Sequence, residues 1–365
     1  MNLGNSANRH DSTEIDTSRM IDRILDFPTD IAKAVETAKG LQIPSAFRTS
    51  RLVLFTGMGG SGIPGDFFKK LYENESRIPL FVNKDYGLPA YVDPDTLVFA
   101  VSYSGTTEET VDSCLQAIKR RAHIIGVTSG DRLLEVCQDN HLPYFLAPTG
   151  RTTRDSFAYV LFPLIAIMQH LSFIPPQDAA IDETIRVCAE LAATCQPTTA
   201  TPANIAKALA ESLFGRLPVI YGSYNCTRAV ALRWTQQFNE NSKVFAHSAT
   251  FPDFTHNEIA AYGASAQFTE SISAIFLRDQ DEHPALQRRV SEAQKILRQA
   301  GADVLDIQSK GDTRLARMLY LSYLGDFASY HLALLHRVDP TETAQMSVLK
   351  RELGLTDLTP GLERA

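Results

Sequence analysis

The sequence lacks the features that mark membrane proteins and nucleic-acid-binding proteins. No stretch approaches the roughly 20 apolar residues that a membrane-spanning helix needs, and residues 1–20 are polar, without the apolar core of a signal peptide. The net charge of −7, from 35 Lys and Arg against 42 Asp and Glu, comes without a long basic block. We therefore expect neither a membrane nor a nucleic acid as a partner.

Cysteine is scarce and shows no pairing pattern. The chain has five cysteines, an odd number, and no C-x-x-C pair among them. This pattern favours a reducing, cytoplasmic setting in which the thiols only pack. The cysteines are Cys114, Cys137, Cys188, Cys195 and Cys226.

Motifs of several enzyme classes are also missing. The sequence contains no H-E-x-x-H, no Cys/His cluster and no G-x-x-x-x-G-K-[ST], which argues against zinc hydrolases and P-loop nucleotide hydrolases. We expect no metal ion and no cofactor.

The chain does contain an alternation of short apolar runs and amphipathic stretches. Strands alternating with helices predict parallel sheets with helices on both faces, and this plan occurs twice, so the predicted fold class is α/β and doubly wound. The expected strands are 51–56, 78–83, 97–102, 123–129, 143–146, 217–222, one within 266–279, and 302–309. The expected helices are 63–75, 108–121, 131–140, 155–171, 203–215, 227–243, 288–301 and 317–336.

The two copies predict the domain boundaries. Residues 1–48 are expected to form an N-terminal extension, disordered to residue 15 and helical from 16 to 48. A stretch rich in proline and threonine ends at residue 203 and separates a first domain, 49–195, from a second domain, 196–365.

A glycine-rich turn follows the first strand. Residues 57–62 read GMGGSG and match G-x-G-x-x-G, the pattern of a dinucleotide-binding turn. Asp85 lies near the end of the second strand, where such a site needs an acid. A dinucleotide site and a tight turn without a ligand are both open from this motif alone.

Small hydroxyls gather after the third strand and favour a phosphate instead. In parallel sheets, loops after neighbouring strands meet at one edge, where hydroxyls and helix N-termini can bind the oxygens of a phosphate monoester. An N-cap role for Thr107 would explain one hydroxyl but not all four. The hydroxyls are Ser102, Ser104, Thr106 and Thr107, and Ser61 in the glycine-rich turn adds a fifth.

These two loops together resemble the sugar isomerase (SIS) domain. The segments are GMGGSG at 57–62 and SYSGTTEET at 102–110. The resemblance implies a flavodoxin-like module that binds phosphosugars and often occurs twice in one chain.

Charged and polar residues converge in the second half of the chain. RWTQQFNENSK at 233–243 ends a predicted helix, and FPDFTHNEI follows at 251–259. Together they bring Glu240, His256 and Glu258 into a short span. An aldose–ketose isomerase needs a group that opens the sugar ring, a base that moves a proton between C1 and C2, and a cation near the enediolate. His256, Glu240 and Arg154 or a lysine fit these needs.

The complete set of motifs resembles the bifunctional phosphoglucose/phosphomannose isomerase family, over about residues 50–350. The ordered matches are 57–62, 102–107, 153–154, 239–243, 256–258, 339–341 and 349–350. Thr106 stands where the family has asparagine, and Thr153 where it has proline. Neither departure removes a group that the reaction needs.

The resemblance implies a role for individual residues. Glu240 is the proton-transfer base, His256 opens the ring from the partner subunit of a homodimer, Lys350 assists ring opening, and Arg154 steadies the enediolate. Arg151 remains an alternative to Arg154. Thr343 leaves room at C2 for both epimers, or else is only a residue at a helix start after Pro340. Substrate binding falls to Gly60, Ser61, Ser102, Ser104 and Thr107.

The sequence thus predicts metal-free isomerisation of glucose 6-phosphate, and of mannose 6-phosphate, to fructose 6-phosphate through a cis-enediol. The active site is expected between the two domains, completed by a second subunit. One alternative is a SIS protein that binds a sugar phosphate without catalysis. The other is a nicotinamide-dependent dehydrogenase.

Overall fold

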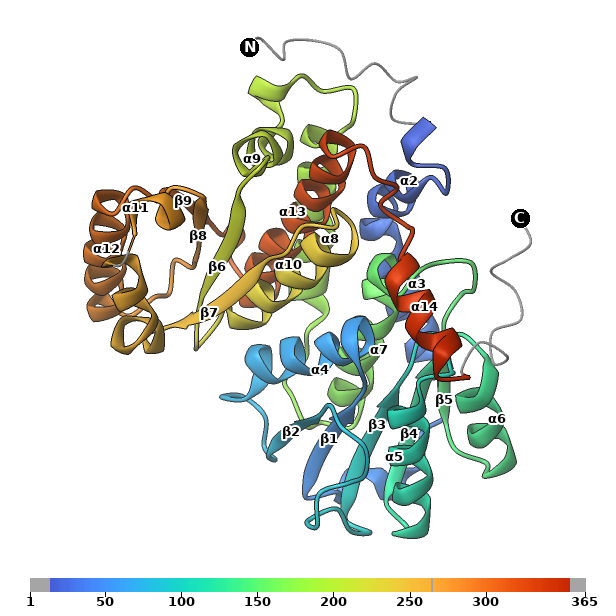
Figure 1. Cartoon of the computed structure of the whole chain (residues 1–365). Coiled ribbons are helices and arrows are strands. Elements are labelled where there is room, and N and C mark those ends of the chain that lie inside the picture. The colour runs from blue at the N-terminus through green and yellow to red at the C-terminus, as the bar shows by residue number, and fades with distance from the viewer. Residues whose placement is uncertain (1–13, 264, 355–365) are drawn as a thin grey trace. The chain divides into compact units, whose positions relative to one another are not determined.

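The computed structural model describes residues 14–263 and 265–354, and the chain divides into two compact units (Figure 1). The β1–β5 unit contains residues 27–181 and 343–354, and the β6–β9 unit contains residues 14–26 and 182–342. The segment expected to be disordered, 1–15, lies outside the described residues except for its last two. No helix in the described ranges is both long and apolar enough to cross a membrane.

A five-stranded parallel sheet forms the centre of the β1–β5 unit. Its strands lie in the order β2-β1-β3-β4-β5, and each coincides with a predicted strand to within a few residues. The strands are β1 (Leu52–Thr56), β2 (Leu80–Asn83), β3 (Thr96–Val101), β4 (His123–Thr128) and β5 (Tyr144–Leu146).

Helices cover both faces of this sheet, as the alternation predicted. On one face Phe55 of β1 packs against Phe68 of α4 with ring centroids 4.9 Å apart. On the other, Leu54 and Val98 share a buried cluster with Cys114 and Cys137 of α5 and α6. The helices are α3 (Phe27–Lys39), α4 (Gly59–Tyr72), α5 (Glu108–Lys119), α6 (Asp131–Asp139), α7 (Phe157–His170) and α14 (Ala344–Glu352).

The β6–β9 unit repeats the plan with four parallel strands in the order β7-β6-β8-β9. An apolar cluster of this sheet with α12 buries Tyr221, Phe276, Val290 and Leu297. The strands are β6 (Leu217–Ser223), β7 (His247–Phe251), β8 (Ile272–Arg278) and β9 (Asp303–Gln308). The helices are α2 (Met20–Leu25), α8 (Asp178–Thr194), which begins in the other unit, α9 (Ile205–Leu213), α10 (Arg228–Glu240), α11 (Ala266–Thr269), α12 (Pro284–Gln299) and α13 (Arg314–Leu335).

Helices α10 and α13 are pressed close together. Trp234 Nε1 donates a hydrogen bond of 2.8 Å to the carbonyl of Leu321. A Cβ added at Gly325 would overlap the same indole ring. The glycine therefore lets the bulkiest side chain of α10 lie directly on the backbone of α13, which fixes the position of the C-terminal end of α10.

Three sequence expectations need correction. The turn expected at 57–62 is shorter, because α4 begins at Gly59 rather than at residue 63. The stretch 16–48 is not helical throughout: α2 ends at Leu25, α3 ends at Lys39, and only a short 3-10 turn, η1, follows at Ser45–Thr49. Strand β7 was not predicted, because HSATF mixes polar and apolar residues on an edge strand whose burial is only partial.

Candidate functional site

The hydroxyl-rich loop between β3 and α5 is organised around Ser102, which is fully buried. Its Oγ donates to Thr107 Oγ1 at 2.9 Å and accepts from the backbone N–H of Gly105 at 3.1 Å. Ser104 Oγ and Thr106 Oγ1 lie 3.1 Å apart. Ser102 donates its single hydroxyl proton to Thr107. The hydroxyl of Thr107 can therefore donate its own proton to a ligand.

Gly105 shapes the same loop. Its φ of +75° lies in the left-handed region, and a Cβ there would overlap the carbonyl of Gly130. Thr107 occupies the N-cap position of α5, yet its side chain makes no capping bond with the described helix. Helix capping therefore does not account for the Thr107 hydroxyl. This observation favours phosphate binding over a capping role for Thr107.

The glycine-rich turn is bonded to the hydroxyl loop. Ser61 Oγ accepts a hydrogen bond of 3.0 Å from the backbone N–H of Tyr103. A Cβ at Gly57 would lie 2.7 Å from the carbonyl of Val101, so the turn passes against the end of β3 without room for a side chain. Gly60 faces Thr153, with 2.8 Å between an added Cβ and Cγ2 of the threonine.

Both loops lie at the carboxyl edge of the sheet where its winding reverses. Strands β1 and β3 are neighbours, but the chain continues from β1 to β2 on one side and from β3 to β4 on the other. Ligands of open α/β sheets bind at such a switch point. Helices α4 and α5 both begin at this edge, and the N-terminus of a helix binds anions favourably. The arrangement can bind a phosphate through N–H and O–H donors.

The two candidate arginines have different surroundings. Arg151 makes an ion pair with Asp30 (2.7 Å between Nη1 and Oδ2), a carboxylate that is 1% exposed. Its guanidinium also lies 5.5 Å from the ring centroid of Tyr159. Arg154 is 6% exposed and begins the short 3-10 turn that leads into α7. Arg151 is thus held in an ion pair with a buried carboxylate, and Arg154 is buried where the chain enters α7.

Glu240 is the last residue of α10, and polar contacts to α13 hold the residues around it. Arg233 and Gln237, on the preceding turns, both bind the carboxylate of Asp326, at 2.9 Å and 2.7 Å. Ser242, just after it, donates to the carbonyl of Ser329 at 2.7 Å. Because the residues on both sides of Glu240 are hydrogen-bonded to α13, the backbone of Glu240 is held in place. A base that transfers a proton needs such a fixed position.

His256 ends the 3-10 turn η4 (Asp253–His256) and is exposed. Glu258, two residues later, accepts a 2.7 Å hydrogen bond from the hydroxyl of Tyr221. Sequence reasoning singled out Glu258 but not its partner. Tyr221 lies in the middle of a buried strand, where a single sequence gives no reason to distinguish it from other core aromatics.

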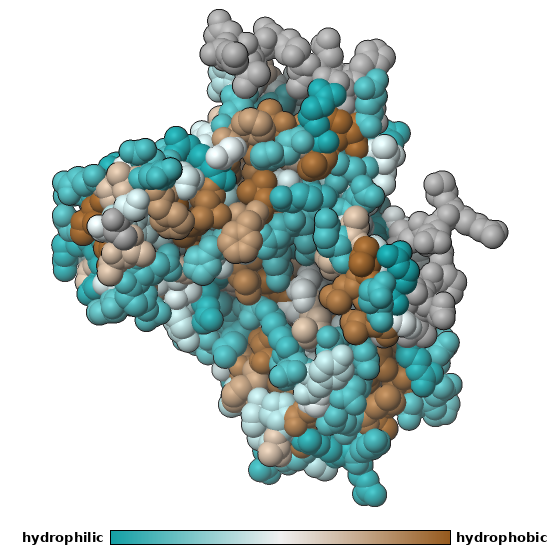
Figure 2. Space-filling model, viewed as in Figure 1, coloured by the Kyte–Doolittle hydropathy of each residue, from teal (hydrophilic) through white to brown (hydrophobic). Residues whose placement is uncertain are grey.

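The remaining candidates lie on or beside α14. Thr343 is half-buried and occupies the N-cap position of this helix, without a side-chain capping bond to the described residues. Lys350 is exposed in the last turn. Apolar residues also remain exposed here, and brown residues show at the place of α14 in Figure 2. Thr343, Lys350, Arg154 and the phosphate loops belong to the β1–β5 unit, and Glu240 and His256 to the β6–β9 unit.

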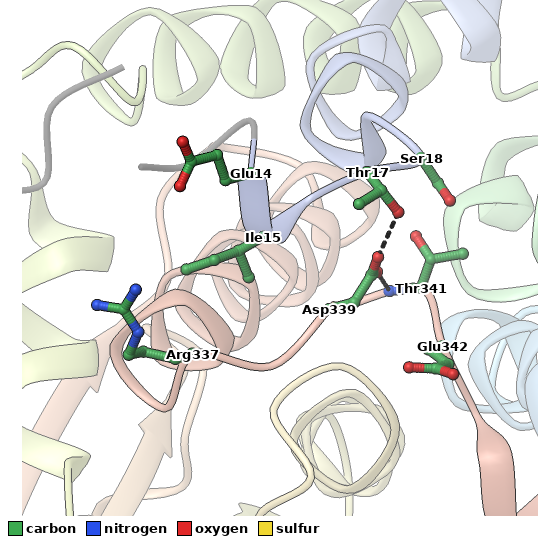
Figure 3. A pocket seen from close by; sticks show the side chains of 8 residues that line it. All are labelled: Glu14, Ile15, Thr17, Ser18, Arg337, Asp339, Thr341 and Glu342. Carbon is green, nitrogen blue, oxygen red and sulfur yellow. Dashed lines mark hydrogen bonds between the residues drawn. The ribbon is translucent and has the colours of Figure 1, made fainter. Parts of the chain in front are cut away.

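Asp339 and Thr341 line an open pocket together with residues of the N-terminal segment, among them Thr17 (Figure 3). Asp339 Oδ2 accepts from Thr17 Oγ1 at 2.6 Å, and its Oδ1 accepts from the backbone N–H of Thr341 at 2.8 Å. The carbonyl of Asp339 also accepts from Lys243 Nζ. Asp339 thus connects the N-terminal segment with the loop that follows Glu240.

Comparisons with known proteins agree with this geometry. Residues 46–138 match the SIS domain, and residues 203–353 match the bacterial phospho-glucose isomerase C-terminal SIS domain. A bifunctional phosphoglucose/phosphomannose isomerase of Caldicellulosiruptor bescii is 35% identical, over 92% of this chain and 98% of its own. One of the same description from Thermoplasma volcanium is 33% identical, over 82% and 91%.

Among solved structures, a hypothetical protein of Thermus thermophilus superimposes with a TM-score of 0.73 at 16% identity, over 96% of this chain and 94% of its own. At this identity the likeness concerns the fold alone. It agrees with the predicted α/β class with two SIS domains, which the sheet orders confirm.

Proposed function

This chain belongs to the bifunctional phosphoglucose/phosphomannose isomerase family, and we propose that it interconverts fructose 6-phosphate with glucose 6-phosphate and with mannose 6-phosphate. The observation that carries the proposal is the bonded pair of loops at the switch point of β1 and β3, in a chain whose relatives are named for this reaction. This family membership removes the support for the alternative function, a nicotinamide-dependent dehydrogenase.

Phosphate binding is the first step of the proposed mechanism. Hydroxyls of Ser61, Ser104 and Thr107, with the backbone N–H of Gly60, bind the phosphate of the substrate. Ser102 orients Thr107 through the 2.9 Å bond between their oxygens. Dianion binding by neutral donors and helix N-termini leaves the catalytic charges free for the reacting carbons.

Ring opening and proton transfer follow. His256 and Lys350 act as acid and base on the ring oxygen and the anomeric hydroxyl, which releases the open-chain sugar. Glu240 then moves one proton between C1 and C2 on one face of a cis-enediol. Arg154 stabilises the enediolate charge without a metal ion. Thr343, a small residue, leaves space at C2 so that both epimers enter the site.

We also propose that the protein acts as a cytoplasmic homodimer in which His256 serves the substrate of the partner subunit. The exposure of His256 supports this arrangement. All five cysteines are buried and free, as expected of a protein from a reducing compartment.

A coupled assay tests the proposal. Purified protein treated with EDTA receives fructose 6-phosphate, and glucose 6-phosphate and mannose 6-phosphate are followed separately. We expect both products from the wild type. We expect Glu240→Gln to lower kcat by about 1,000-fold, because a positioned base contributes about 100- to 10,000-fold.

Three outcomes would count against parts of this proposal. Glucose 6-phosphate alone would contradict the role given to Thr343. Loss of both activities with EDTA would contradict a metal-free reaction. Binding of fructose 6-phosphate without turnover of the wild type would establish a sensor instead of an enzyme.

A further inference from the structure

The imidazole of His256 depends on its backbone for its position. It is exposed, and no hydrogen bond or ion pair within the described part of the chain holds it. Its turn, η4, follows β7 directly and is followed by a second 3-10 turn, η5 (Glu258–Gly263). A residue that opens a sugar ring must meet the ring oxygen within hydrogen-bond reach. Something must therefore fix the backbone on both sides of His256.

The residues two positions before and two positions after His256 both contact Tyr221. Phe254 is 1% exposed, and its ring centroid lies 4.3 Å from that of Tyr221. Glu258 Oε1 accepts the hydroxyl proton of Tyr221 at 2.7 Å. Tyr221 itself is fully buried in β6, where it faces Ala249 of β7 and Phe276 of β8 in register. One rigid side chain thus anchors both flanks of His256.

The hydroxyl of Tyr221 has a second partner that sets its direction. Tyr262 Oη lies 2.7 Å from Tyr221 Oη. Each phenol has one proton, and burial raises the pKa of both, that of Tyr262 to about 12. Tyr221 donates to the carboxylate of Glu258, so Tyr262 must donate to Tyr221. The result is a one-way chain of donors, Tyr262 to Tyr221 to Glu258.

The other carboxylate oxygen of Glu258 lies 3.5 Å from Nε2 of His247, an exposed histidine at the start of β7. Glu258 therefore joins β6, β7 and η5 through side chains. Its backbone also continues directly from Asn257, the residue that follows His256.

We infer that Tyr221 is a positioning residue for His256, acting through Glu258 and Phe254. The inference rests on the proposed function, in which His256 opens the sugar ring. Tyr221 touches no substrate. It fixes the backbone of residues 254–258 and, through it, the position of the His256 imidazole.

The test is Tyr221→Phe, which keeps the ring packing on Phe254 and removes only the hydroxyl. Two rates are compared: interconversion of the α and β anomers of glucose 6-phosphate, which needs ring opening alone, and isomerisation to fructose 6-phosphate. We expect both kcat values to fall together by about tenfold, since small misplacements of a catalytic group cost up to about 100-fold. Affinity for sorbitol 6-phosphate, an open-chain probe, should change less than twofold.

Three further variants separate positioning from general destabilisation. Tyr323→Phe removes an equally buried hydroxyl of the same unit, whose bond goes to the carbonyl of Ile24 at 2.6 Å. It should lower the melting temperature without changing either rate. Glu258→Gln keeps an acceptor for Tyr221 and should retain most activity, whereas Glu258→Ala should reproduce Tyr221→Phe.

A Tyr221→Phe protein with both kcat values within twofold of wild type would overturn the inference. If that variant does not fold, Glu258→Ala, whose side chain is 27% exposed, decides in the same way. His256→Ala distinguishes this failure from failure of the proposed function. If His256→Ala keeps its anomerisation rate, the role of His256 is wrong; if that rate is lost while Glu258→Ala keeps it, only the inference is wrong.

Discussion

Two arginines three residues apart differ in what holds them. Arg151 neutralises Asp30, whose carboxylate is buried and also accepts from Tyr159 at 2.8 Å. Arg154 precedes α7 and is buried at the start of that helix. The sequence PTGRTTRDSF cannot separate them, because the difference depends on Asp30, more than a hundred residues away in the chain.

Substitution at each arginine should therefore give a different defect. Arg154→Gln should lower kcat by about 100-fold or more, as loss of one stabilising group for a transition-state charge does. Arg151→Gln should leave the kcat of folded protein near wild type and destabilise by about 3–5 kcal/mol, because a buried carboxylate loses its partner. Steady-state kinetics and thermal melts of both variants check this. Equal kinetic defects would contradict the assignment.

Tyr221, like the difference between the two arginines, could not be recognised from the sequence alone. Motif spacing selected Glu240, His256 and Glu258 as candidates, since these residues lie in a polar stretch that a core would not contain. Tyr221 is one of several aromatics in β6 and its neighbours, and only its hydrogen bond reveals a second use. A residue that acts through another side chain is therefore recognised only from the three-dimensional structure.

At the scale of elements, α4 shows where glycine misled the prediction. Glycine disfavours helix interiors by about 1 kcal/mol relative to alanine, so GMGGSG predicted a turn. The helix nonetheless begins at Gly59, and Gly62 lies inside it because a Cβ there would overlap the carbonyl of Gly57. Close packing of backbone on backbone outweighs propensity at this position. Elements with a clear apolar pattern, such as α7, were predicted nearly to the residue.

Gly62→Ala should disturb this helix start. The overlap is with backbone, which cannot move aside cheaply, so we expect a loss of about 1–3 kcal/mol in stability and at least tenfold weaker binding of sorbitol 6-phosphate. Thermal melts and calorimetry measure the two effects. Gly130→Ala is the matched control, since an added Cβ there meets nothing within 4 Å and its backbone is extended. Unchanged binding by Gly62→Ala would refute the steric argument.

At the scale of the whole molecule, one buried histidine links folding to pH. His331 of α13 is 4% exposed, and burial, with Lys207 nearby, lowers its pKa to about 3. Its Nε2 is buried without a partner among the described residues, which leaves no acceptor for a second proton. The fold therefore accepts only the neutral ring.

Stability should fall with acid for this reason. Because the folded pKa of His331 is lowered, its contribution is fully present above the unfolded value of 6.5 and is lost as pH falls toward 3. The expected slope in the free energy of unfolding is about 1.4 kcal/mol per pH unit between roughly pH 6 and 4. Denaturant unfolding of the wild type and of His331→Asn should show this slope only in the wild type. His170→Asn, at an exposed site, should keep it.

The bonds that attach the N-terminal segment have a consequence for synthesis on the ribosome. Ile24 accepts from Tyr323, 299 positions later, and Thr17 donates to Asp339, 322 positions later. At about 5–20 residues per second, the ribosome takes roughly 15–60 s to supply these partners. The strands and helices of residues 27–181 can meanwhile form their own sheet. Residues 17–24 are thus synthesised long before the residues that bind them, and a nascent chain exposes their apolar face, Met20 and Ile24, throughout that interval.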